Sequence, residues 1–184
     1  MKHCSKILIL LMIVSTVCAC ASRRQIEPIK WEYEKEAIKL QIKADTDLNW
    51  HGGTSHTLHL CVYQLKDRNV FENLAGYEDG LRTLLNYSCN LRDDRVVKSE
   101  SLFISPGEFK LLTMDRAEGA QHVAIAAGYE GFSKHRATRD KKIPVITETK
   151  GFIRRKEIKK PGHLNIEITL GKEQILTFKE IKGK

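Results

Sequence analysis

The sequence predicts an all-β protein: a two-sheet antiparallel β-sandwich with a short helical insertion. Apolar and polar residues alternate in several short segments, turn-forming residues separate them, and a three- to four-residue apolar period appears in one region only. We expect strands at 36–44, 57–65, 95–104, 109–114, 121–129, 143–148, 164–170 and 174–178.

Individual segments differ in how much of the strand should be buried. Residues 36–44 and 164–170 alternate cleanly, as half-buried strands do. Residues 57–65 are apolar on both faces, which is typical of a strand in the middle of a sandwich. We interpret 95–114 as a hairpin because a Pro-Gly pair divides it. Pro144 suits 143–148 to a sheet edge.

The helical period occupies residues 66–87, where two glycines interrupt it. It predicts two short helices, near 68–75 and 78–87, packed on one edge of the sheet. Residues 131–142 are basic and show no alternation, so we expect them to be irregular.

The N-terminus has the pattern of an export signal. Lys2 and Lys6 precede an apolar run at 7–17, which is about half the roughly 20 residues that a membrane-spanning helix needs. Val17-Cys18-Ala19-Cys20 then resembles a bacterial lipobox, with Cys18 as its one departure.

The lipobox resemblance implies that Cys20 carries a diacylglycerol and becomes the mature N-terminus, and the absence of Asp after it implies outer-membrane sorting. The alternative is an ordinary cleaved signal with an incidental cysteine. We expect a signal peptide at 1–19, a lipidated tether at 20–34 and a β-sandwich domain at 35–180 that faces the periplasm.

The formal charge is +8, and it falls to +6 when Lys2 and Lys6 leave with the signal. Much of the excess lies in the basic stretch 150–160. The export signal argues against nucleic acid as a partner. We interpret the stretch as a solvated hairpin loop, with lipid or peptidoglycan contact as the alternative.

Two cysteines, Cys61 and Cys89, remain outside the signal and the lipobox. Disulfides persist in an oxidising compartment, so the pair could be bridged. Cys61 lies in a strand pattern and could equally be a small core residue, because the sequence does not give the separation of the two Cα atoms.

No convincing catalytic or metal-binding set is present. Asp93 and Asp94 form a paired carboxylate in a polar turn, where solvation is the simpler interpretation. His56 and His59 would point to opposite faces of an extended strand, and no Cys or carboxylate completes a ligand set with His51. We therefore expect neither an enzyme, a metal site nor a cofactor.

The segment 45–56 breaks the strand pattern with Asp, Asn and Gly and is too long for a tight hairpin. It contains Leu48 and Trp50, which are costly to expose. They either pack back onto the core or form a contact point for a partner.

Several segments together resemble the TssJ (SciN/VasD) family, the outer-membrane lipoproteins of type VI secretion systems, over roughly residues 20–170. The matching segments are Cys20, Asp47-Leu48-Asn49, Val62-Tyr63-Gln64-Leu65-Lys66 with Phe71, Leu84-Leu85, Ser105-Pro106-Gly107-Glu108 and Ala124-Ile125-Ala126-Ala127-Gly128-Tyr129.

The resemblance implies a transthyretin-like sandwich that anchors the secretion membrane complex by binding the periplasmic C-terminal domain of the inner-membrane protein TssM. It also implies that the loop between the first two strands makes the contact. Here that loop comprises Asp47, Leu48, Asn49, Trp50, His51, Gly52, Gly53, Thr54, Ser55 and His56. The alternative is a lipoprotein that binds a small ligand or cell-wall glycan.

Overall fold

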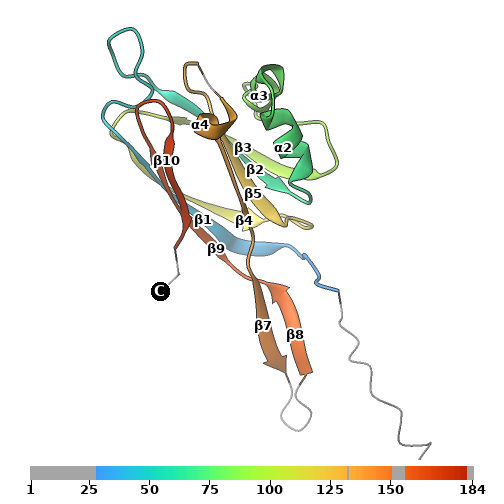
Figure 1. Ribbon diagram of the computed structural model, residues 1–184. Helices are drawn as coiled ribbons and strands as arrows, with labels where there is room; N and C mark the ends of the chain where they lie inside the picture. Colours follow the sequence, from blue (N-terminus) through green and yellow to red (C-terminus); the bar gives the residue numbers. More distant parts are fainter. Residues whose placement is uncertain (1–27, 132, 151–155, 182–184) are drawn as a thin grey trace, which may run out of the picture.

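A computed structural model describes residues 28–131, 133–150 and 156–181 of the 184 (Figure 1). The signal peptide, Cys20 and most of the predicted tether lie outside the described residues.

Two four-stranded sheets form the sandwich, which confirms the predicted fold class. The first sheet has the order β10-β9-β1-β4 and comprises β1 (Glu34–Ala44), β4 (Phe109–Arg116), β9 (Leu164–Leu170) and β10 (Ile175–Glu180). The second has the order β3-β2-β5-β6 and comprises β2 (Leu58–Leu65), β3 (Val96–Ile104), β5 (His122–Ala127) and β6 (Thr138–Lys142). All pairings within them are antiparallel except that of β1 with β9.

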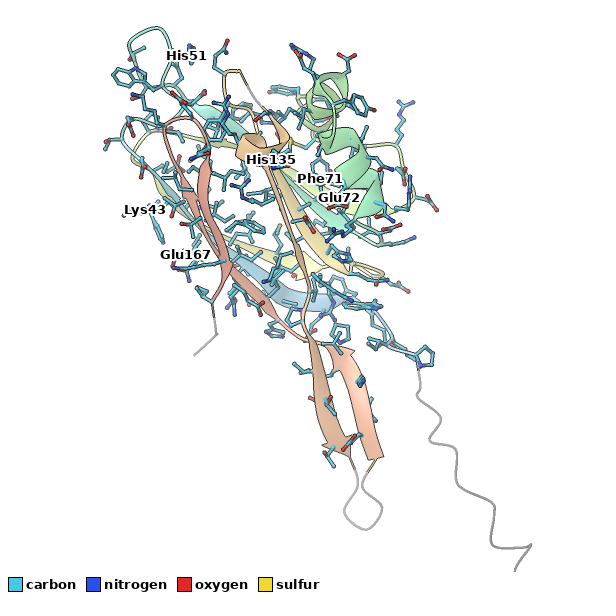
Figure 2. All side chains as sticks on the ribbon, in the orientation of Figure 1. Lys43, His51, Phe71, Glu72, His135 and Glu167 are labelled. Carbon is cyan, nitrogen blue, oxygen red and sulfur yellow. A yellow bond between two sulfur atoms is a disulfide. The ribbon has the colours of Figure 1, made fainter. Side chains whose placement is uncertain are left out.

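The main core fills the space between the sheets. Alternate residues of β1, such as Ile38, Leu40 and Ile42, are fully buried, and the apolar residues of β9 are buried beside them. The intervening polar residues face outward, and Lys43 and Glu167 project from the outer face of the first sheet (Figure 2). The alternation in the sequence therefore records which face of the sheet meets the core.

β2 is buried on both faces, as its composition predicts. Its second face is covered by α2 (Asn69–Ala75) and α3 (Glu78–Leu84), the predicted helical insertion, which packs on the face of the sheet and not on its edge as expected (Figure 1). Tyr63 of β2 packs beside Phe71 of α2, and its hydroxyl donates a hydrogen bond to the Leu84 carbonyl. Burial raises the pKa of Tyr63, which keeps the hydroxyl protonated as a donor.

The predicted hairpin at 95–114 is wrong. Its two strands, β3 and β4, lie in different sheets, and the turn at 105–108 carries the chain across the sandwich. Gly107 N–H donates to the Asp45 carbonyl, and Ala44 N–H donates to the Glu108 carbonyl. The turn is thus attached to the end of β1, which makes β4 a neighbour of β1 instead of β3.

The expectation of an irregular segment at 131–142 is also wrong, because it contains α4 (Lys134–Ala137) and β6. β6 is an edge strand that pairs with β5 alone, and only Thr138 of its five residues is buried. A strand with so little buried surface needs no apolar alternation, so the sequence gives little sign of it.

The two remaining strands, β7 (Val145–Lys150) and β8 (Lys156–Pro161), form a hairpin that projects from the sandwich (Figure 1). The strand predicted at 143–148 exists as β7, and it is an edge strand as expected, but of the two-stranded sheet that it forms with β8 and not of the sandwich. Part of the basic stretch is therefore strand β8, while 151–155 lies outside the described residues.

Candidate functional site

The loop between β1 and β2, residues 45–57, begins by packing back onto the sandwich. Leu48 is fully buried in the main core. The next residue, Asn49, has a positive φ of 47° and is also buried, and its side-chain oxygen accepts a hydrogen bond from the Glu130 N–H at 3.0 Å. Asparagine tolerates this left-handed conformation better than most residues. Of the two interpretations of the loop's apolar residues, Leu48 therefore fits the core and not an exposed contact.

Trp50 instead lies at the surface, with 39% of its area exposed. Its backbone N–H donates to the Lys172 carbonyl at 3.0 Å, and the Lys172 ammonium lies 5.2 Å from the centre of the indole ring. This is the geometry of a cation–π contact. Trp50 is thus held in place without being buried.

The tip of the loop is a small, closed turn. His51 and Thr54 form a β-bridge around Gly52 and Gly53, whose φ values are 57° and 84°. The His51 and His56 rings stack with their centroids 3.7 Å apart. These contacts order the tip before any partner arrives.

The remaining predicted loop residues support this shape. Ser55 Oγ donates to the Thr46 carbonyl at 2.8 Å, and His56 N–H donates to the Leu48 carbonyl at 3.1 Å. Asp47 is partly exposed before Leu48. The structure thus brings 47–56 together as one ordered loop, in which Leu48 and Asn49 are internal.

Sequence reasoning missed Lys172, which lies in the turn between β9 and β10. The parallel pairing of β1 with β9 places Ala44 beside Leu170, so both strands end at the same end of the sheet. This end carries the loop 45–57 and the turns at 105–108 and 171–174, and we call it the loop end. Figure 2 shows His51 at this end and the β7–β8 hairpin at the other.

A disulfide joins Cys61 of β2 to Cys89, with a Cα–Cα distance of 5.5 Å. The His59 ring lies against it, with Nε2 3.5 Å from the Cys89 sulfur and 2.9 Å from Ser101 Oγ. Burial lowers the pKa of His59. His59, Cys61 and Cys89 place possible metal-ligand atoms within 4.8 Å of one another. The two sulfurs are bonded to each other, however, and are not the thiolates that a metal requires.

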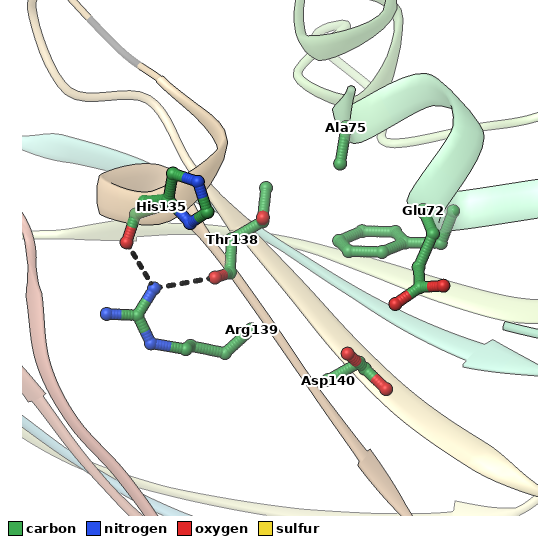
Figure 3. Close-up of a pocket in the computed structure, with 7 residues that line it drawn as sticks. Glu72, Ala75, His135, Thr138, Arg139 and Asp140 are labelled. Carbon is green, nitrogen blue, oxygen red and sulfur yellow. Dashed lines mark hydrogen bonds between the residues drawn. The ribbon is translucent and has the colours of Figure 1, made fainter. Parts of the chain in front are cut away.

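A shallow pocket lies between α2 and β6 (Figure 3). Its charged groups are engaged with neighbours: Arg68 contacts Glu72 at 2.8 Å and Asp140 at 3.7 Å, and Arg139 donates to the carbonyls of His135 and Thr138. A general acid or base must contact its substrate, whereas the carboxylates of Glu72 and Asp140 in this pocket are paired with Arg68.

None of the described helices is long and apolar enough to cross a bilayer.

The fold and the loop end together define a β-sandwich domain with an ordered loop at one end. The family model for type VI secretion lipoproteins (VasD, EvfM, TssJ) matches residues 36–172. The chain belongs to this family, which confirms the resemblance drawn from the sequence, and members of the family are membrane-anchored structural lipoproteins. A search of curated protein sequences finds no match.

Solved structures share the fold at low sequence identity. The lipoprotein TssJ1 of Pseudomonas aeruginosa matches with a TM-score of 0.55 at 16% identity, covering 83% of this chain and 98% of that one. Serratia marcescens Lip, a membrane-bound component of the type VI secretion system, gives 0.57 at 17%, covering 80% and 98%. A chain of a type VI membrane complex gives 0.53 at 18%, covering 82% and 98%.

Proposed function

We propose that this protein is a non-enzymatic outer-membrane lipoprotein, anchored through a diacylglycerol on Cys20, that binds the periplasmic C-terminal domain of a TssM-like inner-membrane protein. Through that contact it would anchor the membrane complex of a type VI secretion system. The observation that carries the proposal is the ordered loop 45–57, which presents Trp50 at the loop end of the sandwich.

The position of the loop suits a tethered adaptor. The chain enters the sandwich at Glu34 and reaches the loop after the eleven residues of β1, a span of roughly 35 Å. The loop end therefore lies on the side of the domain away from the N-terminal tether. A partner that approaches from across the periplasm would meet this end first.

The chemistry of the loop also suits protein recognition. Tryptophan is enriched among the residues that contribute most to protein interfaces. The Trp50 backbone is bonded to Lys172 and its ring contacts the Lys172 ammonium, so part of the ordering that binding requires is already present in the free protein. Lys172 adds a positive charge beside the ring, which a carboxylate of the partner could approach.

The test is binding of the mature chain without its lipid to the purified periplasmic domain of the cognate TssM-like protein. Trp50→Ala should weaken binding by about 30-fold or more, as loss of an interface hot spot does. Leu48 is unsuitable for this test, because its removal would disturb the core.

Tyr77→Ala is the matched control, since Tyr77 is an exposed aromatic residue at the start of α3 and outside the loop. Its removal should leave the affinity unchanged. Equal affinity of the wild-type and Trp50→Ala proteins would move the interface away from the loop, and absence of binding by folded wild-type protein would overturn the proposed function.

A further inference from the structure

The β7–β8 hairpin is left without a role by the proposed partner loop. It pairs with no other strand of the described residues. A two-stranded hairpin on its own is at best marginally stable in water. We propose that this hairpin lies on the anionic phospholipid surface of the membrane that holds the lipid anchor and orients the domain there; the inference rests on the proposed lipidation of Cys20.

The hairpin and the tether start from the same point of the domain. Buried Arg116 donates from Nε and Nη2 to the Glu32 carbonyl, and from Nη1 to the carbonyl of Gly162, directly after β8. Glu34 completes the junction by contacting Arg116 at 2.8 Å and His163 at 2.9 Å. The base of the hairpin is thereby fixed to the segment where the tether enters the sandwich.

The lengths of the two segments match. Each strand of the hairpin has six residues and extends about 20 Å from the base. The twelve residues from Cys20 to Trp31 span about 40 Å when fully extended and about 20 Å as a flexible chain. An anchor in the membrane therefore keeps the hairpin within reach of the same surface.

The side chains of the hairpin suit an interface between water and lipid. Each face of the hairpin presents an apolar side chain and a lysine. Ile146, 43% exposed, lies beside the exposed Lys160 on one face. Val145, 38% exposed, shares the other face with Thr147 and the exposed Lys159. Lys160 pairs with Glu148. The two strands together contain four basic and two acidic residues. Basic residues are drawn to anionic head groups, and small apolar side chains can enter the boundary below them.

The experiment uses the mature lipoprotein, with its lipid, in vesicles of phosphatidylcholine alone or with a minority of phosphatidylglycerol. An environment-sensitive fluorophore is attached at Thr147→Cys on the hairpin, or at Thr113→Cys on the outer face of β4 as a control; both residues are exposed. Cys61 and Cys89 are bonded and do not compete for the label.

The label at residue 147 should shift to the blue on anionic vesicles only, and high salt should reverse the shift. The label at 113 should not respond. Lys159→Ala with Lys160→Ala removes the exposed lysine from both faces and should lower the equilibrium constant for membrane contact of the hairpin about fivefold, the effect of the one lysine that faces the membrane. Lys39→Ala with Lys43→Ala, which removes two exposed lysines of β1, should leave it unchanged.

Identical emission in both kinds of vesicle overturns the inference while the protein still floats with the vesicles, and it leaves the proposed anchoring intact. A shift that appears only on adding peptidoglycan or the partner domain also overturns it. A protein that carries no acyl chains by mass spectrometry and fails to float refutes the anchoring and, with it, the inference.

Discussion

The Cys61–Cys89 disulfide should account for a large share of the stability of the domain. It closes a segment of 28 residues that contains α2 and α3 and fastens them to β2. The chain-entropy model gives about 3.5 kcal/mol for a loop of this size. For a domain of this length each kcal/mol corresponds to about 2–4 °C in Tm, so loss of the bond should lower Tm by about 7–14 °C.

The assay is thermal and urea unfolding of the mature chain, comparing the wild type with Cys61→Ala plus Cys89→Ala. Both cysteines are fully buried, so the double variant also loses some packing and should fall at the upper end of the range. A reductant should destabilise the wild type and leave the double variant unchanged. A loss below about 1 kcal/mol in the double variant would refute the reasoning, as would two thiols that react with alkylating reagent in the unfolded, unreduced wild type.

Three further predictions concern stability. Leu48→Ala should cost about 2–5 kcal/mol in urea unfolding, while Trp50→Ala should cost less than about 1 kcal/mol, because only the first is fully buried; equal losses would contradict this division. Gly80→Ala should cost about 1–3 kcal/mol, since a Cβ there would clash with the Leu74 carbonyl group, and an unchanged Tm would contradict that contact. The last prediction concerns the carboxylate of Glu34. Burial raises its pKa, but the hydrogen bond with His163 and the charge of Arg116 outweigh this and hold the pKa below 4.5. The ionised Glu34 should therefore stabilise the fold fully above about pH 4.5, and this stabilisation should be lost as the pH falls through the lowered pKa. When Tm is measured against pH, it should fall less at low pH in Glu34→Gln than in the wild type. Parallel curves for the two proteins would exclude this effect.

The sequence predicted those elements whose burial leaves a periodic trace. β1, β2 and β9 alternate or are largely apolar because each meets the core along most of its length, and the helical insertion was visible because its period changed. β6 was missed because it buries little apolar surface.

Pairing partners could not be predicted in the same way. Nothing local in 95–114 shows that its two strands belong to different sheets, since that depends on the attachment of the 105–108 turn to Asp45. For the same reason Lys172 was not connected with Trp50, and the two orientations of Leu48 and Trp50 remained open.

The pairing of β1 with β9 also has a consequence for how the chain folds. β1 is the first strand to be synthesised, yet it is completed on one side by β4 and on the other by β9, where Ile38 meets Leu164. Contacts so distant along the chain are formed slowly, on a scale of milliseconds to seconds for β-sandwiches. Until β9 (Leu164–Leu170) is available, the apolar residues of β1 and its unpaired backbone edge stay open to water and to other chains. A chaperone that covers unpaired strands would therefore have β1 as a target. Truncation before β9 should yield an aggregating protein and not a smaller folded domain.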